Sequence, residues 1–230
     1  NNTSAVYKNI TNNGLISLTS GIKLPLPTSD TFSSLAVGDL DNNGFLDVLV
    51  GGSALIPILN IPTVPSASLD ATHFQAMLSS PITTVTGSNT VALGDINNDG
   101  YLDVIAGGRS STMTVVLNDS SGTFNPLIDL SFAISNTVNS IALGDLNGDG
   151  SLDIVAGQLT STVYLNDGVG RFHAQYQLTG TNALSITKLA LGDLNADSYL
   201  DIVAVVPGHK NLVYFNNGSG DFSEPTVLQS

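Results

Sequence analysis

The chain has 230 residues, with 6 Lys and Arg against 19 Asp and Glu, so its formal net charge is −13 at pH 7. This charge argues against nucleic-acid binding, because such a surface needs clustered cations to neutralise phosphates. The absence of cysteine excludes disulfides, thiolate metal sites and cysteine nucleophiles. A hydrophobic content of 42% favours a folded protein over a disordered acidic tail. No apolar run approaches the roughly 18 residues of a membrane-spanning helix.

In chain order, the first expected element is a pair of strands joined by a turn within residues 5–27. Its string VYKNITNNGL, at Val6, is echoed by VVLNDSSGTF at Val115, VYLNDGVGRF at Val163 and VYFNNGSGDF at Val213. Each string has the pattern of strand, turn and strand. The later copies form the second half of a longer repeat, so we interpret residues 5–27 as a half unit.

Four complete units follow, at about residues 31–80, 88–134, 138–180 and 185–230. They contain the strings AVGDLDNNGFLDVLVGG, ALGDINNDGYLDVIAGG, ALGDLNGDGSLDIVAGQ and ALGDLNADSYLDIVAVV, which begin at Ala36, Ala92, Ala142 and Ala190. The leading Asp residues of successive strings are 56, 50 and 48 residues apart. This spacing is typical of β-propeller blades.

Each unit contains four short β-type runs separated by Gly, Asn, Asp and Ser, as in SIALGD, LDIVAG, STVYLN and RFHAQYQL of the third unit. Only residues 70–79 have any helical character, and we interpret them as an elaborated blade edge. The sequence therefore predicts an all-β fold, a single propeller domain over residues 1–230 with four-stranded antiparallel blades and an N-terminal half blade. Ring closure stays open, since a closed four-bladed ring needs no half blade and a larger ring needs further strands.

The loop between the first two strands of each unit has the pattern D-x-[DN]-x-[DN]-[GS]-x-x-D. Oxygen donors at alternate positions of a tight turn, closed by a later carboxylate, can converge on one Ca²⁺ ion. The seventh position has no shared side chain, so we expect its backbone carbonyl to be the fifth donor. The predicted ligands, for about four Ca²⁺ ions, are Asp39, Asp41, Asn43, Phe45 and Asp47; Asp95, Asn97, Asp99, Tyr101 and Asp103; Asp145, Asn147, Asp149, Ser151 and Asp153; Asp193, Asn195, Asp197, Tyr199 and Asp201.

A simpler interpretation is that the Asn, Asp and Gly residues are hairpin turn signals that need no metal. Each loop nevertheless has three carboxylates, which repel one another unless a cation neutralises them. Twelve of the 19 acidic residues lie in these loops, so four Ca²⁺ ions would change the formal charge from −13 to −5. An EF-hand is excluded, because its bidentate Glu at position twelve is replaced by Val50, Ala106, Ala156 and Ala204. Mg²⁺ suits such an all-protein oxygen site less well.

From GDLNGDGSLDIVAG through VYLNDGVGRF, the units resemble the FG-GAP or VCBS-type repeats of integrin α-subunit propellers and of many bacterial extracellular proteins. The resemblance extends over nearly the whole chain. It implies calcium loops with a structural role, on the face away from the usual ligand surface. Ser198 stands where the family pattern has Gly, and we therefore expect the fourth loop to bind Ca²⁺ most weakly.

These observations predict a secreted, non-enzymatic calcium-binding module for adhesion or for recognition of a protein or glycan. Several sites of modest affinity suit millimolar extracellular calcium, at the cell surface or beyond it. No nucleophile or phosphate-binding motif indicates an enzyme. A first alternative is a structural subunit of an extracellular assembly or filament, joined by strand pairing through the N-terminal half blade. A lectin ranks third, because the loops GGRSST, GQLTST and PGHKN are not alike.

The loops between the second and third strands are expected on the face opposite the acidic loops. They contain Arg109, His209 and Lys210, and Lys188 is expected nearby. An acidic partner could dock on these residues. A solvated surface is the alternative interpretation.

Overall fold

The computed structural model describes residues 5–6, 22–26, 31–61, 73–76, 87–108, 113–118, 124–128, 137–179 and 185–228. Within these residues the chain forms four four-stranded sheets and one two-stranded sheet. None of the described segments is a helix of the length and apolarity that crossing a membrane requires. The predicted all-β class and four-stranded antiparallel blades are confirmed.

Each four-stranded sheet is one of the predicted repeats, with its strands in chain order across the sheet. The first blade contains β3 (Phe32–Gly38), β4 (Asp47–Gly52), β5 (Leu55–Asn60) and β6 (Phe74–Ala76). The second contains β7 (Ser88–Gly94), β8 (Asp103–Gly108), β9 (Met113–Asn118) and β10 (Phe124–Ile128). The third contains β11 (Ser140–Gly144), β12 (Asp153–Gly157), β13 (Thr162–Asn166) and β14 (Phe172–Gln177), and the fourth β15 (Lys188–Gly192), β16 (Asp201–Val205), β17 (Leu212–Tyr214) and β18 (Thr226–Val227).

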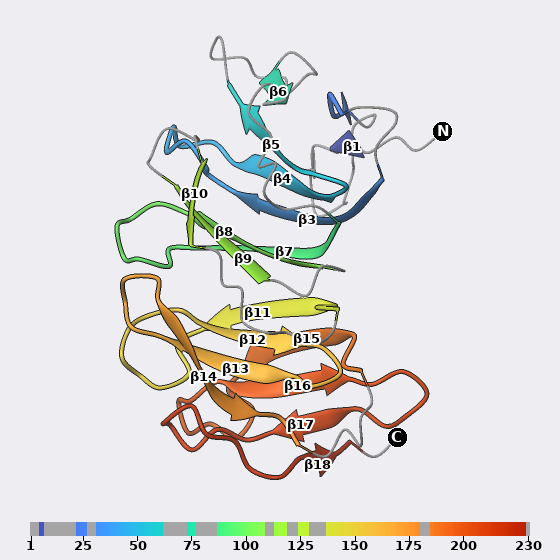
Figure 1. Ribbon diagram of the computed structural model, residues 1–230, viewed down its shortest axis with the longest axis vertical. Helices are drawn as coiled ribbons and strands as arrows, with labels where there is room; N and C mark the ends of the chain where they lie inside the picture. Colours follow the sequence, from blue (N-terminus) through green and yellow to red (C-terminus); the bar gives the residue numbers. More distant parts are fainter. Residues whose placement is uncertain are drawn as a thin grey trace, which may run out of the picture.

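The blades are stacked in chain order, from blue to red in Figure 1. Their first strands lie next to one another, since β3 contacts β7, β7 contacts β11 and β11 contacts β15. Residues 70–79 are the stretch whose sequence has some helical character. Within it, residues 74–76 form the fourth strand of the first blade and pair with β5. The expectation of a blade edge at this position is therefore correct for the part that the structure describes.

The N-terminal half unit forms β1 (Ala5–Val6) and β2 (Ile22–Lys23), which are antiparallel, with Ala5 opposite Lys23. In the third blade the corresponding pair is Thr162 opposite Gln177, between the third and fourth strands. Leu24, directly after β2, packs on the first blade, as Leu178 after β14 packs on the fourth. The half unit thus supplies the third and fourth strands of a blade that precedes β3.

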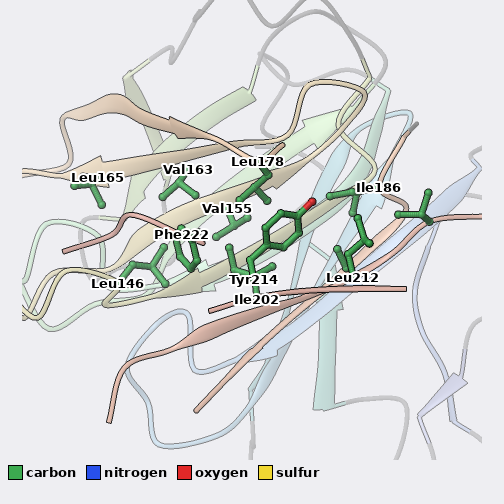
Figure 2. Close-up of a cluster of buried hydrophobic side chains, with 12 residues drawn as sticks. Leu146, Val155, Val163, Leu165, Leu178, Ile186, Ile202, Leu212, Tyr214 and Phe222 are labelled. Atoms are coloured by element: carbon green, nitrogen blue, oxygen red, sulfur yellow. The ribbon is translucent and has the colours of Figure 1, made fainter. Parts of the chain in front are cut away.

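The hydrophobic core consists of separate clusters between neighbouring blades. Figure 2 shows the cluster between the third and fourth blades, where Leu146 and Val155 meet Ile202 and Tyr214. Full burial of one such side chain contributes about 1.5–3 kcal/mol. The Tyr214 hydroxyl donates to the Thr179 carbonyl at 2.7 Å, and burial raises the pKa of Tyr214 to about 12. Because each cluster needs side chains from two blades, one blade alone would leave a core face exposed.

Candidate metal centre

The four acidic loops have the same place in their blades, between the first and second strands. In the third blade, β11 ends at Gly144, the loop begins at Asp145, and Asp153 is the first residue of β12. Gly144 and Asp153 are opposite each other in the antiparallel register. The hairpin therefore brings the ninth loop residue close to the first, as the sequence pattern requires.

The first Asp of each loop holds the turn through its side chain. In the third loop, Asp145 Oδ1 accepts hydrogen bonds from Gly148 N at 2.7 Å and Asp149 N at 3.2 Å, and Oδ2 accepts one from Gly150 N at 2.9 Å. In the other loops too, the fifth and sixth N–H groups donate to the first Asp. The side chain at position five in turn accepts the N–H of position seven.

Two positions in every loop have left-handed backbone. They are the fourth and sixth residues, Asn42 and Gly44, Asn98 and Gly100, Gly148 and Gly150, and Ala196 and Ser198. Gly and Asn adopt this conformation with the least strain, whereas other residues lose roughly 1–2 kcal/mol. The fourth loop is the most strained, because it has neither residue type at these positions. Sequence reasoning identified Ser198 but missed Ala196.

The ninth-position Asp is completely buried in each loop. In the third loop, Asp153 Oδ2 accepts a hydrogen bond from Leu146 N at 2.8 Å, and Oδ1 accepts one from Asn166 N at 2.9 Å. The pKa of Asp153 is raised to about 6, chiefly by burial and to a smaller extent by the nearby Asp149 and Asp145 carboxylates, while the two N–H donors oppose the rise. Burial likewise raises the pKa of Asp47 and Asp103.

Three carboxylates converge in the first loop. One carboxylate oxygen from each of Asp39, Asp41 and Asp47 lies within 4.8 Å of the others. In the remaining loops the third position is Asn, whose amide nitrogen donates to the fifth-position Asp at 2.8–2.9 Å. Among the described residues, no other group of three acidic or His side chains is as close.

The donor set fits a hard divalent cation. The side chains are carboxylates and amides, and oxygen is the ligand atom that Ca²⁺ takes in proteins. An ionised carboxylate has about four lone-pair sites, so accepting two N–H groups leaves sites for an ion. Asp47 shows this arrangement, with hydrogen bonds from Leu40 N and Asn60 N at 2.7 Å each and the Asp39 and Asp41 carboxylates beside it.

One group of residues next to the loops was missed as part of the site. Asn118, Asn166 and Asn216, at the end of the third strand or just after it, each donate an amide hydrogen to the second-position carbonyl of the preceding blade's loop. The acceptors are Leu40 O, Ile96 O and Leu146 O, at 2.7–2.8 Å. The signal was the recurring Asn in VVLN, VYLN and VYFN. Each of the first three acidic loops is thereby hydrogen-bonded to the next blade as well as to its own.

The structure describes three of the four residues of the predicted basic face. Lys188 is exposed and lies opposite Val205 in the sheet, at the end of the fourth blade remote from Asp193. His209 N donates to the Val206 carbonyl, so exposed His209 and Lys210 lie at the same end. Arg109 lies outside the described residues. The predicted opposition of cations and acidic loops therefore holds within the fourth blade.

Comparison with known proteins finds one matching family model and several solved structures of similar fold. The model of a family described as an FG-GAP-like repeat matches residues 95–156. These residues extend from the second acidic loop into β12 of the third blade. No curated protein sequence matches the chain.

Among solved structures, the lead-soaked crystal structure of BBS1N in complex with ARL6DN matches 97% of this chain at 9% identity, with a TM-score of 0.59. The mercury-soaked crystal matches the same share at 10% identity and a TM-score of 0.55. The chain spans 62% and 61% of those chains, and the likeness extends to the fold alone. The V. cholerae biofilm matrix protein Bap1 matches 83% of this chain at 17% identity, with a TM-score of 0.48, over 30% of its own length.

Proposed function

Because the chain is an FG-GAP repeat protein, we propose that it is a secreted, non-enzymatic module for adhesion or recognition, stiffened by about four structural Ca²⁺ ions. The observation that carries this proposal is the common frame of the four acidic loops, in which the first Asp holds the turn and the ninth Asp is buried behind it. Three carboxylates in one turn are costly without a cation. The repeat family supports an extracellular adhesion-type module.

The ion's contribution would be charge neutralisation and cross-linking of the loop. The chain's own residues do the rest: the first Asp orders the N–H groups of positions five and six, and the ninth Asp ties the loop to the third strand. The Asn166 side chain donates hydrogen bonds both to the acidic loop of its own blade and to that of the preceding blade. Ordering one acidic loop would therefore help to order the neighbouring one. Binding to the folded state alone stabilises it by mass action.

Calorimetric titration of the metal-free protein with Ca²⁺ tests the metal assignment. We expect several sites, with a rise in melting temperature at millimolar Ca²⁺ and a much smaller rise with Mg²⁺. The control variant Asp167→Asn removes a carboxylate from the β13–β14 turn, outside the acidic loops, and should leave the titration unchanged. Absence of heat and of a melting shift would contradict the calcium proposal.

The basic residues Lys188, His209 and Lys210 are the proposed docking face for an acidic protein or glycan, with Arg109 as a further candidate. Their exposure and their distance from the negative loops support this choice. Charge reversal by Lys188→Glu and Lys210→Glu should abolish binding to anionic glycans on an array without changing calcium binding. Unchanged glycan binding would remove this face from the proposal.

The alternative function, a subunit of an extracellular assembly, is favoured by one observation: among the described residues, β1 pairs only with β2. Light scattering in millimolar Ca²⁺ and after chelation separates the two functions. A monomer near 23.7 kDa favours the recognition module. A multimer that dissolves on chelation favours the assembly.

A further inference from the structure

The turn that follows β17 contains an Asn–Gly pair, Asn217 and Gly218, which belongs neither to the acidic loops nor to the basic face. In such a pair the main-chain nitrogen of Gly can attack the side-chain carbonyl of Asn, because Gly has no Cβ to obstruct the approach. Two further pairs lie among the described residues, Asn43–Gly44 and Asn147–Gly148, both inside acidic loops. Since the three pairs are chemically alike, a difference in their reactivity must come from their surroundings.

Hydrogen bonds hold the Asn217 turn at both ends. Asn217 N donates to the Asp221 carbonyl at 3.1 Å, and Gly218 N donates to Asn216 Oδ1 at 2.9 Å. Asn216 is buried, and its amide nitrogen donates to main-chain carbonyls of two acidic loops. The turn is therefore fixed to the body of the protein, while the side chains of Asn217 and Ser219 are exposed to water.

Two donors point at the side-chain carbonyl of Asn217. Ser219 Oγ lies 2.6 Å from Asn217 Oδ1, and Ser219 N lies 3.0 Å from the same oxygen. Asp221 Oδ2 is a second acceptor for the hydroxyl, but at 3.3 Å it is the more distant one. Negative charge develops on Oδ1 when the carbonyl carbon is attacked, so donors already aimed at this oxygen lower the barrier. The leaving group, Asn217 Nδ2, makes no hydrogen bond to the described residues.

The pairs in the acidic loops have the opposite surroundings. Gly148 N donates to Asp145 Oδ1 at 2.7 Å, and Asn147 Nδ2 donates to Asp149 Oδ2 at 2.8 Å. In the first loop the corresponding Gly nitrogen likewise donates to the first Asp, at 2.7 Å. These carboxylates hold the attacking nitrogen, and their negative charge opposes the formation of an oxyanion beside them. The acidic loops should therefore slow the reaction that the Asn217 turn favours.

We propose that Asn217 is a site of self-modification, at which the folded turn promotes deamidation to an aspartyl or isoaspartyl residue. Gly218 N forms a bond to Asn217 Cγ, the Cγ–Nδ2 bond breaks, and the proton of Gly218 N leaves with Nδ2 as ammonia. Water then opens the resulting succinimide ring. Opening at Cγ gives an aspartyl residue, and opening at the main-chain carbonyl carbon gives an isoaspartyl residue. Water is the one co-reactant, and no step uses Ca²⁺ or a binding partner.

The third repeat shows which product the turn accepts. Asp167 occupies the corresponding position, and its Oδ1 accepts hydrogen bonds from Val169 N and Arg171 N at 3.1 Å each. An aspartyl product therefore keeps the turn. An isoaspartyl product adds a methylene to the main chain directly before Gly218, which packs so closely on Tyr199 that an added Cβ would lie 2.5 Å from the ring. This product should loosen the contact between the turn and the fourth acidic loop.

The first test is incubation of the intact chain at mildly alkaline pH, followed by peptide mapping with mass spectrometry. In the folded chain, Asn217 should deamidate faster than Asn43 and Asn147, whereas the three sites should react at similar rates in urea. An isoaspartyl methyltransferase assay identifies the isoaspartyl fraction. If folding slows Asn217 relative to urea, the turn protects the pair and the proposal is wrong.

Ser219→Ala tests the role of the hydroxyl. It removes one neutral hydrogen bond to the reacting carbonyl, so deamidation of the folded chain should slow by about 2- to 10-fold. The rate in urea should not change, and Ser219→Thr, which retains the hydroxyl, should keep the rate of the unmodified chain. Melting curves establish that both variants fold. An unchanged rate in folded Ser219→Ala would overturn the assignment.

The turn between β13 and β14 provides a matched control. Asp167→Asn creates an Asn–Gly pair there, with Val169 at the position of the hydroxyl. Adding Val169→Ser on this background should raise its rate by about 2- to 10-fold, and no rise would contradict the role of the hydroxyl. All rates are measured both in chelator and in Ca²⁺. A fast reaction at Asn217 in both, combined with a failed calcium titration, would remove the calcium proposal and leave this one standing.

Discussion

The third and fourth repeats share the strings ALGDLN and LDIVA at their acidic loops but have very different surroundings. Leu146 and Leu194 both occupy the second loop position, yet Leu146 is 1% exposed and Leu194 is 52% exposed. The fourth blade covers Leu146 with Ile202 and Tyr214, as Figure 2 shows, and Leu194 lacks such a cover among the described residues. Burial at this position therefore comes from the next blade, so similar motifs contribute unequally to stability.

Truncation of these two leucines should give the largest contrast. Leu146→Ala should lower the free energy of unfolding by about 2–5 kcal/mol, because it opens a cavity in a packed cluster. Leu194→Ala should cost less than about 1 kcal/mol, since the side chain is already half in water. Urea denaturation of both variants measures the difference. Equal losses would mean that Leu194 is covered in solution.

The two glycines at the ends of β11 and β15 extend the comparison. A Cβ at residue 144 would lie 2.6 Å from Leu200 Cδ1, whereas a Cβ at residue 192 would have nothing within 4 Å. Gly144→Ala should therefore cost about 1–3 kcal/mol, while Gly192→Ala should be close to neutral. Chemical denaturation again gives both values. If Gly192→Ala lost stability and Gly144→Ala did not, our assignment of Gly144 as the covered glycine and Gly192 as the uncovered one would be wrong.

Acidity should affect the third repeat in a defined direction. Burial raises the pKa of Asp153 to about 6, above its unfolded value near 4, so the folded chain binds this proton more tightly. In chelator, lowering the pH from 7 to 5 should therefore add stability on the order of 1 kcal/mol through this group. The effect should be absent in Asp153→Asn, and saturating Ca²⁺ should oppose it. Identical pH profiles for the two proteins would contradict the assignment.

The strands and acidic loops could be predicted because their signals are local. The repeated ALGDL and LDIVAG strings fixed the hairpins, and the register of β11 with β12 agrees with them. The Asn166 contact could not be predicted, because it joins residues 70 positions apart whose approach depends on how two blades dock. Ala196 was missed for a related reason: Gly148, its counterpart, reads as an ordinary turn residue until the backbone shows φ of 76° there and 62° at Ala196.

The smallest predicted effect concerns that strain. Ala196→Gly and Ser198→Gly should each stabilise the fourth loop by about 0.5–1 kcal/mol, since glycine relieves the left-handed strain but adds entropy to the unfolded chain. The reciprocal changes Gly148→Ala and Gly150→Ser should weaken the third loop by a similar amount. A Cβ added at Gly148 or Gly150 would have no other atom within 4 Å, so the effect isolates backbone strain from packing.

The double variants Ala196→Gly/Ser198→Gly and Gly148→Ala/Gly150→Ser should then exchange the order of calcium affinity of the third and fourth loops in a calcium titration. In the unmodified chain the fourth loop should bind most weakly, and the Gly pair should raise its affinity severalfold because less strain opposes the ordered loop. Terbium luminescence excited through the exposed Tyr199 can follow the fourth loop separately when Tyr101, the corresponding tyrosine of the second loop, is replaced by Phe in every variant. An unchanged fourth-loop affinity would show that the ion does not require the left-handed turn, and the carboxylates alone would then determine binding.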